Sequence, residues 1–298
     1  MSGAQLTERI KSEFDRMPAQ MQSAARFILE NPSEVALLSM REQARLASVP
    51  PATMTRLAQR LGLSGYDELK AIFADNMRDS AAWFSGRAEG MLSRREKLGE
   101  KGLVSAMAES LSGYISALAS PKATASFIAA ADCLSKAERI LCIGARASFP
   151  VAYQFSYVQS YFWDRAMLLD GPGNIGLDPL RRARPNDVLF AVSFDPYALS
   201  TIEAVELAAR AGVPVVAITD SELSVIGRLA TVPIIVPVRS PSFFDTISPA
   251  FAAAEILMAL LASRLGSSVP DIVRQREQGL TAAGVWLSGT RPANEKEP

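Results

Sequence analysis

Five short apolar runs in the second half of the chain constrain its fold most, because helical stretches separate them. The runs cover residues 140–143, 166–169, 188–192, 213–218 and 232–236. Parallel strands covered by helices on both faces are continuously apolar rather than alternating. Residues 200–211 and 249–265 fit the helices that such a sheet requires. We therefore predict a five-stranded parallel sheet flanked by helices, an α/β sandwich that binds ligands at the carboxyl ends of its strands.

The first quarter of the chain has a different, helical pattern. Leu6, Ile10, Phe14 and Met17 recur every three or four residues, and Asn31-Pro32 interrupts the pattern. At 298 residues the chain exceeds one typical domain of ~100–150 residues. We predict an all-α domain followed by an α/β domain, with four segments: an all-α domain at 1–77, a helical linker at 78–120, an α/β domain at 121–270, and a C-terminal helix and tail at 271–298.

Composition excludes several classes of protein. Histidine is absent, which excludes Ser-His-Asp and Cys-His catalysis and histidine-ligated metals. The two cysteines, Cys133 and Cys142, are too few for a disulfide framework and indicate a reducing compartment. The apolar runs are shorter than the ~20 residues of a membrane span, and Glu8, Glu13 and Asp15 argue against a signal peptide. We expect a cytoplasmic protein without a metal, a cofactor or a membrane.

The stretch from Ser39 to Leu61 has the punctuation of two short helices joined by a turn. Ser39 and Glu42 match a capping box, which satisfies free amides at a helix start. Ser48-Val49-Pro50 forms the turn, Pro51 suits the first turn of the second helix, and Gly62 suits its end. This pattern predicts a helix-turn-helix.

Polar residues on the second helix suit DNA. Met54, Leu57, Ala58 and Leu61 form the predicted buried side. The side chains on or near the outer side are of types that bind bases or phosphates, and they are Thr53, Thr55, Arg56, Gln59 and Arg60. These five residues and Arg41 are the candidate DNA-binding residues. Residues 41–60 carry four arginines and one acid, a net charge of 4 − 1 = +3. The alternative is an ordinary helical hairpin with a polar face.

Residues 40–70 closely resemble the N-terminal domain of RpiR/MurR-type transcriptional regulators. The matching motifs are Thr53-Met54-Thr55-Arg56, Leu61-Gly62 and Gly65-Tyr66-Asp67. The sequence departs from the family at Pro50, where a serine usually caps the helix, and loss of this cap costs ~1 kcal/mol. The resemblance extends over nearly the whole chain. It implies a C-terminal sugar isomerase (SIS) domain, a five-stranded parallel α/β sandwich that usually binds phosphosugars.

Two segments resemble the ligand-binding signatures of SIS domains. Gly144-Ala-Arg-Ala-Ser148 follows the first apolar run, where the family has Gly-x-Gly-x-Ser. A glycine turn with a hydroxyl near a helix start is suited to phosphate. Arg146 replaces a small residue, and either adds charge to an anion site or caps the crevice.

The second segment departs from its signature, Ser-x-Ser-Gly-x-Thr. Here Ser193-Phe-Asp-Pro-Tyr197 is followed by Ser200 and Thr201, which are equally suited to capping a helix. Asp195 repels phosphate and Pro196 lacks an amide donor, so Asp195 either binds a sugar hydroxyl, pairs with Arg146, or marks a ligand without phosphate. The candidate ligand-binding residues are Gly144, Arg146, Ser148, Ser193, Asp195, Tyr197, Ser200 and Thr201.

Three further residues receive structural predictions. Core packing is predicted for Phe243 and Phe244, which precede the long apolar stretch at 249–265. Glu255 lies inside that stretch, where a buried carboxylate needs a partner. It is either a relic of isomerase chemistry or a structural hydrogen-bond acceptor. We assign no catalytic residue.

These observations predict a DNA-binding transcriptional regulator whose SIS domain senses a small metabolite. The partners are a double-stranded DNA operator and a sugar, sugar phosphate or related carbohydrate derivative, and the protein is predicted to form a homodimer or homotetramer. One rival is a phosphosugar isomerase-like enzyme with an accessory N-terminal domain. Another is a helical adaptor that binds protein rather than DNA.

Overall fold

The N-terminal helices begin and end where the sequence predicts. In the computed structural model, which describes residues 3–31, 34–35, 38–80, 83–171 and 176–285, this region is helical as predicted. Pro18 immediately precedes the second long helix, and the side chain of Asn31 closes it by donating to the carbonyl of Phe27 at 3.0 Å. The elements are α1 (Gly3–Glu13), η1 (Phe14–Arg16), α2 (Ala19–Glu30), α4 (Met40–Leu46), α5 (Pro51–Arg60) and α6 (Tyr66–Ser80).

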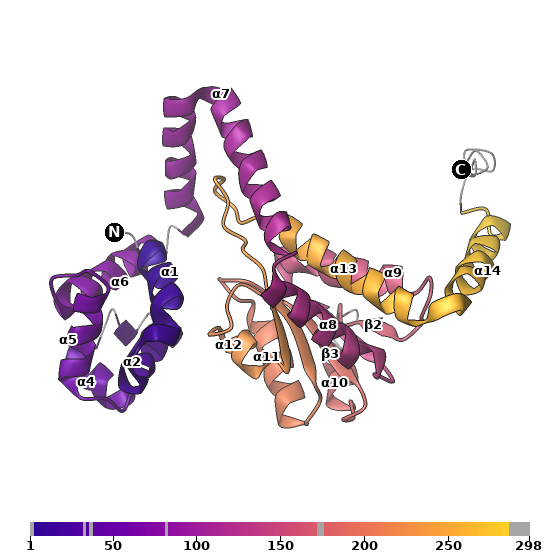
Figure 1. Ribbon diagram of the computed structural model, residues 1–298, viewed down its shortest axis with the longest axis horizontal. Helices are drawn as coiled ribbons and strands as arrows, with labels where there is room; N and C mark the ends of the chain where they lie inside the picture. Colours follow the sequence, from indigo (N-terminus) through magenta and orange to yellow (C-terminus); the bar gives the residue numbers. More distant parts are fainter. Residues whose placement is uncertain (1–2, 32–33, 36–37, 81–82, 172–175, 286–298) are drawn as a thin grey trace. The chain divides into compact units, whose positions relative to one another are not determined.

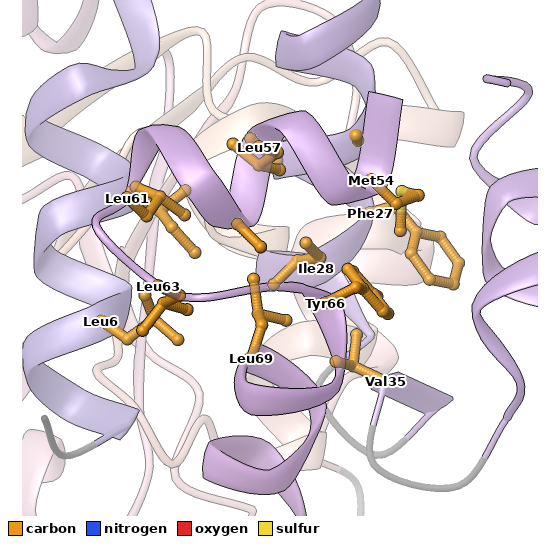
Figure 2. Close-up of a cluster of buried hydrophobic side chains, with 14 of the residues drawn as sticks. Leu6, Phe27, Ile28, Val35, Met54, Leu57, Leu61, Leu63, Tyr66 and Leu69 are labelled. Carbon is orange, nitrogen blue, oxygen red and sulfur yellow. The ribbon is translucent and has the colours of Figure 1, made fainter. Parts of the chain in front are cut away.

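One hydrophobic core holds these helices together. Figure 2 shows that side chains of α1, α2, α5 and α6 meet in this core. The α5 side chains that enter the core include Met54 and Leu57. The contributing residues recur at helical spacing, so each helix buries one face. Among the fully buried members are Leu6, Ile28, Met54, Leu57 and Leu69.

A long connecting helix, α7 (Trp83–Ala117), follows the helical domain. Gly99 has φ 69° and ψ 178°, so the helix is interrupted there and consists of two helical halves. Glycine suits this position because a positive φ is strained for other residues. The charged run at 94–97 is exposed on the first half. The predicted helical connector is therefore present, with a break that the sequence analysis did not locate.

The second half of the chain forms the predicted parallel sheet, with strand order β2-β1-β3-β4-β5. The strands are β1 (Ile140–Gly144), β2 (Ala166–Leu168), β3 (Val188–Val192), β4 (Val215–Thr219) and β5 (Val232–Ile235). Every residue of β1, β3 and β4 is buried, which explains their continuous hydrophobicity. In register, Ile140 lies opposite both Ala166 and Val188.

Helices connect and flank these strands (Figure 1). They are α8 (Pro121–Ser135), α9 (Phe149–Gln159), α10 (Asp178–Arg181), α11 (Leu199–Arg210), α12 (Val225–Leu229) and α13 (Ser248–Arg264), with the short turn η2 (Arg146–Ser148). After α13 come the short turn η4 (Gly266–Ser268) and α14 (Val269–Ala282), which has no buried residue among those described. By its internal contacts the chain divides into two compact units. One contains residues 1–117, 219–229 and 235–249, and the other contains 118–218, 230–234 and 250–298.

Among the described residues, no single helix is long and apolar enough to cross a membrane. Only α13 and α14 meet the length and composition requirements as a pair, and they are bent by 102° at their junction.

A buried carboxylate joins the beginnings of β1 and β3. Asp187 is 1% exposed and accepts hydrogen bonds from Nε and Nη2 of Arg139 at 3.0 and 2.6 Å. It also accepts one from the backbone amide of Arg184 at 2.8 Å. The Arg139 guanidinium, aided by that amide, holds the pKa of Asp187 below its ordinary value. The pair connects the residues that immediately precede β1 and β3, which are neighbours in the sheet.

We expect Asp187→Asn to lower the free energy of unfolding by about 2 kcal/mol at neutral pH, because Arg139 loses its charged partner. A carboxyl whose folded-state pKa is depressed stabilises the fold above its unfolded pKa of about 3.9, and this contribution disappears as pH falls through the folded value. Urea unfolding of both proteins at pH 7 and at pH 3 measures the effect. If the difference in the free energy of unfolding between the wild type and Asp187→Asn were as large at pH 3 as at pH 7, the ion-pair explanation would be contradicted.

Candidate DNA interface and ligand crevice

The start of α4 confirms the predicted cap. The Oγ atom of Ser39 accepts a hydrogen bond from the amide of Glu42 at 3.3 Å. At the other end of α4, the amides of Ser48 and Val49 donate to the carbonyls of Arg45 and Ala44, at 3.1 and 2.9 Å. These bonds close the turn between α4 and α5. Pro51 then occupies the first turn of α5, as predicted.

The end of α5 also follows the predicted signal. The helix ends at Arg60, and Gly62 has φ 81°. The amide of Leu63 donates to the carbonyl of Ala58 at 3.0 Å, and that of Gly62 to Gln59 at 2.9 Å. This is the glycine-terminated helix end in which a left-handed residue satisfies the last carbonyls. The fold of residues 39–61 therefore follows from its caps and its apolar face.

The turn between α4 and α5 places a serine in a left-handed conformation. Ser48 has φ 56°, which costs an L-residue about 1–2 kcal/mol. Glycine lacks that cost but has more freedom in the unfolded chain. We expect Ser48→Gly to raise the free energy of unfolding of the helical domain by about 0.5–1 kcal/mol, measured by thermal unfolding. Ser48→Val should have the opposite sign, and equal stability of the two variants would contradict the strain argument.

The structure sorts the candidate DNA-binding residues into two groups. Arg41, Arg56 and Gln59 are exposed, in keeping with an outward-facing role. Thr55 is half-buried, and its hydroxyl donates to the sulfur of Met40 at 3.5 Å.

One member of the set differs from the prediction, and a second has partners within the chain. Thr53 is only 9% exposed, so its predicted outward position was wrong. It precedes Leu57 by four residues and therefore shares the buried face of the helix. Arg60 is exposed, but its Nε lies 3.2 Å from a carboxylate oxygen of Glu13, and its Nη2 donates to the carbonyl of Arg16 at 3.1 Å. Arg60 thus joins α5 to the end of α1.

A buried polar network behind α4 was missed by the sequence analysis. Gln43 is fully buried, and its amide nitrogen donates to the carbonyls of Val35 and Leu38 at 3.0 and 2.9 Å. Its amide oxygen accepts a hydrogen bond from the hydroxyl of Tyr66. Burial raises the pKa of Tyr66 far above its ordinary value, so the hydroxyl stays a donor. The sequence signal for this network was the position of Gln43 next to Ala44, on the inner face of α4.

The first ligand-binding segment follows β1 immediately. Gly144 ends the strand, and a Cβ there would lie 2.5 Å from the carbonyl oxygen of Ser148, so no larger residue fits. This close approach folds η2 back over the strand end. Arg146 is exposed with φ 54°, and Ser148 is buried. The family signature has a glycine at the position of Arg146, and glycine adopts this left-handed conformation without strain. In this chain an arginine adopts it instead.

The second segment lies beside the first. Gly144 pairs in register with Val192, the residue before Ser193, so both segments leave the sheet at adjacent points. Ser193 is buried, and its Oγ accepts a hydrogen bond from the amide of Ala198 at 3.4 Å. Ser200 is exposed in the first turn of α11.

Three other predicted residues of this segment are partly or fully buried. Asp195 and Tyr197 are half-buried, and each interacts with other groups of the chain. The Asp195-Pro196 peptide bond is cis. Thr201 is fully buried, and its Oγ1 has no hydrogen-bond partner among the described residues. The N-cap residue of α11 is Ala198, whose methyl group cannot accept a hydrogen bond from the first amides of the helix. A helix start without a side-chain cap and an unpaired hydroxyl therefore lie at the carboxyl end of the sheet.

Two structural predictions near this edge were wrong. Glu255 is exposed rather than buried, and it accepts a hydrogen bond from Gln154 at 3.3 Å, which agrees with the acceptor alternative. Phe243 and Phe244 are 43% and 42% exposed and do not pack in a core. Glu255 lies on a largely apolar helix and the two phenylalanines lie in the loop before it, but all three residues are exposed.

Two family models match the chain. Residues 4–80 match a helix-turn-helix domain of the rpiR family, and residues 133–260 match a SIS domain. The chain therefore has an rpiR-family helix-turn-helix domain and a SIS domain. The rpiR-type match spans the helix-turn-helix described above, and the SIS match spans all five strands.

Related proteins agree with this identification. The rpiR-family chain is 25% identical over 227 residues to an uncharacterised helix-turn-helix transcriptional regulator of Caldanaerobacter subterraneus, covering 74% of this chain and 75% of that protein. It is 33% identical over 78 residues to the transcriptional regulator HexR of Pseudomonas aeruginosa, covering 26% and 27% of the two chains. The chain is therefore a helix-turn-helix transcriptional regulator.

Solved structures share its fold. One is Vibrio vulnificus NanR complexed with ManNAc-6P, with a TM-score of 0.51, 20% identity, and coverage of 93% of this chain and 99% of NanR. Another is the sugar isomerase domain of an RpiR transcription factor from Sphaerobacter thermophilus, with a TM-score of 0.50, 23% identity, and coverage of 59% and 93%.

Proposed function

We propose that this regulator binds a DNA operator through α4 and α5 and senses a sugar-like anion at the ends of β1 and β3. The observation that carries the DNA part is the exposure of Arg41, Arg56 and Gln59 on helices whose opposite faces form the core. Arginine binds guanine or phosphate, and glutamine pairs with adenine. A rigid helix that presents these groups outward is suited to a major groove.

The ends of β1 and β3 support an anionic effector. Amide groups at a helix start are donors for anions, and α11 begins there without a side-chain cap. The unpaired hydroxyl of Thr201 supplies one further donor. Asp195 is suited to accept hydrogen bonds from sugar hydroxyls rather than to contact phosphate. We infer a ligand with one anionic group and several hydroxyls, which is a sugar phosphate or a sugar acid.

We infer that the SIS domain is a sensor rather than an isomerase. Enzymatic isomerisation requires a base positioned to move a proton. The chain has no histidine, and Glu255 is exposed and hydrogen-bonded to Gln154. An isomerase assay with hexose 6-phosphates, showing turnover that Glu255→Gln abolishes, would favour the enzyme instead.

We propose that the regulator acts as a homodimer or homotetramer, because paired helix-turn-helix units read two half-sites. An exposed aromatic row on α9 supports self-association. Phe149, Tyr153 and Tyr157 follow one another at four-residue spacing, with ring centroids 6.2 and 6.0 Å apart. A surface of this kind is typical of an interface, since aromatic residues are enriched there. Light scattering of the full chain measures the oligomeric state.

The DNA part is tested by selecting double-stranded DNA from a random pool with the full chain. We expect a discrete operator, with affinity that falls steeply as salt increases because phosphate contacts release counterions. Enrichment of no sequence, or binding that does not depend on salt, would refute the proposed DNA role and favour the helical adaptor.

The effector part is tested by thermal unfolding with hexose 6-phosphates, the parent sugars and sugar acids. A ligand of the folded state raises the unfolding midpoint. We expect Thr201→Val to stabilise the ligand-free protein by about 1 kcal/mol, because it removes an unpaired buried hydroxyl, and to reduce the midpoint shift given by the anion. Ser263→Ala on the exposed surface is the control. A full ligand shift in Thr201→Val would exclude that hydroxyl from the site.

A further inference from the structure

The loop that follows β5, residues 236–247, is closed by its own hydrogen bonds. The amide of Thr246 donates to the carbonyl of Val238 at 2.8 Å, and the hydroxyl of Ser240 donates to the carbonyl of Phe244 at 2.7 Å. We call this segment the β5 loop. Because the strands are parallel, it leaves the sheet at the same edge as the ends of β1 and β3. Residues 235–249 nevertheless group with the helical half of the chain, residues 1–117, in one compact unit.

An arginine of α7 explains that grouping. The Nη2 atom of Arg87 lies 2.7 Å from Oδ1 of Asp245 and donates to the carbonyl of Ser242 at 3.4 Å. The side chains of Arg87 and Asp245 are only 21% and 15% exposed, so solvent screens their attraction less than that of a surface pair. Arg239, also on the β5 loop, approaches the second oxygen of Asp245 at 3.7 Å.

An aromatic contact lies beside this ion pair. The ring of Phe84 stacks on that of Phe244, with centroids 4.9 Å apart and planes 12° apart. Phe84 and Arg87 are three residues apart and therefore share one face of α7. Figure 1 shows the β5 loop extending beside the first half of α7, in agreement with these contacts. We call Phe84, Arg87, Phe244 and Asp245 the anchor.

The anchor is held by few contacts, and some of its polar atoms are not fully paired. The Nη1 atom of Arg87 is buried without a hydrogen-bond partner among the described residues. Oδ1 of Asp245, despite its 2.7 Å approach, lacks the geometry of a hydrogen bond. A small displacement of the β5 loop can therefore break this arrangement or pair these atoms differently. Coupling between sites is carried by elements that can change from one packing arrangement to another.

We propose that the anchor links the ligand edge of the sheet to the DNA-binding domain, so that a change at that edge alters how the first half of α7 holds the helix-turn-helix. This inference rests on the proposed function, because it requires an operator whose affinity responds. The β5 loop provides the connection, since it continues β5 at one end and contacts α7 through Asp245 and Phe244. Coupling of this kind is reciprocal, so release of the anchor changes operator affinity.

The test compares three variants of the full chain. Arg87→Met removes the charge and keeps the length of the side chain, and Phe244→Leu removes the ring and keeps the ion pair. Arg95→Met is the matched control, because Arg95 lies on the same half of α7 but pairs with Glu100 on the exposed surface, at 56% and 77% exposure. Hydrogen exchange of residues 83–98 and 236–247 is measured first, without DNA or ligand. Affinity for the operator selected by the wild-type chain is measured second.

We expect both anchor variants to raise amide exchange in the β5 loop about tenfold and to change operator affinity about fivefold, whereas the control changes neither. Unchanged exchange in the β5 loop of both variants would refute the anchor. Faster exchange with unchanged operator affinity would refute the coupling and leave a purely structural contact. Selection of no operator by the wild-type chain refutes the proposed function and the coupling, whereas the exchange measurement still decides whether the anchor exists.

Discussion

Replacing Arg56 with alanine is expected to weaken operator binding by about 1–3 kcal/mol, which corresponds to roughly 5- to 150-fold in affinity. Arg56 is exposed in the middle of α5, where a guanidinium can reach a base edge or a phosphate. Fluorescence anisotropy with the selected operator, at two salt concentrations, measures the loss. If Arg56 contacts a base, the loss of affinity depends on the DNA sequence. If it contacts a phosphate, affinity falls equally for all DNA sequences and depends less steeply on salt concentration.

The control for Arg56→Ala is Arg94→Ala, an equally drastic change at an exposed arginine of α7. We expect it to leave operator affinity within about twofold of the wild type, because surface substitutions away from an interface cost little. Equal affinity of the Arg56→Ala variant and the wild type for every DNA sequence would remove α5 from the interface. Circular dichroism of both variants separates a binding defect from loss of the helix.

Replacing Gln43 with alanine is expected to lower the free energy of unfolding of the helical domain by about 3 kcal/mol. The substitution leaves the buried carbonyl of Val35 and the Tyr66 hydroxyl without this partner. The carbonyl of Leu38 loses one of two donors and keeps Nζ of Lys70 at 2.9 Å. An unsatisfied buried polar group costs about 1–3 kcal/mol, and water that enters the site offsets part of the sum. Denaturant unfolding followed by circular dichroism measures the change.

Gln59→Ala is the matched control for Gln43→Ala, because the same side chain is removed from an exposed position on the neighbouring helix. We expect it to change stability by less than about 0.5 kcal/mol. Tyr66→Phe, which removes only the hydroxyl, should give an intermediate loss. Equal stability of the Gln43→Ala and Gln59→Ala variants would mean that the buried network contributes no net stability.

The strands and most helices could be predicted because local signals determine them. Continuous apolar runs identified the sheet, and the cap at Ser39, the proline at position 51 and Gly62 determined the ends of α4 and α5. Each signal acts over a few residues, so the sequence shows it directly. The two candidate ligand-binding segments follow two of these runs immediately, so their place at the ends of β1 and β3 could be predicted for the same reason.

Contacts between residues distant in sequence could not be predicted. The partner of Arg60 is Glu13, 47 residues away, and that of Arg87 is Asp245, 158 residues away, so no local pattern reveals either pair. Thr53 was misplaced for a different reason, because it lies at the boundary between the two faces of α5. Glu255 was expected to be buried because its neighbours are apolar. The apolar residues of α13 lie on all sides of the helix, so the sequence does not indicate which side faces solvent.

The burial of every residue in β1, β3 and β4 also bears on how proteins of this kind diverge. A substitution inside those strands disturbs packing on both faces of the sheet, and Gly144 excludes any side chain at the end of β1. The positions just beyond the strands, such as Arg146 and Asp195, are free of that constraint because they lie outside the core. Descendants of one ancestor can therefore acquire different effectors by exchanging a few loop residues, while the scaffold that carries them stays the same.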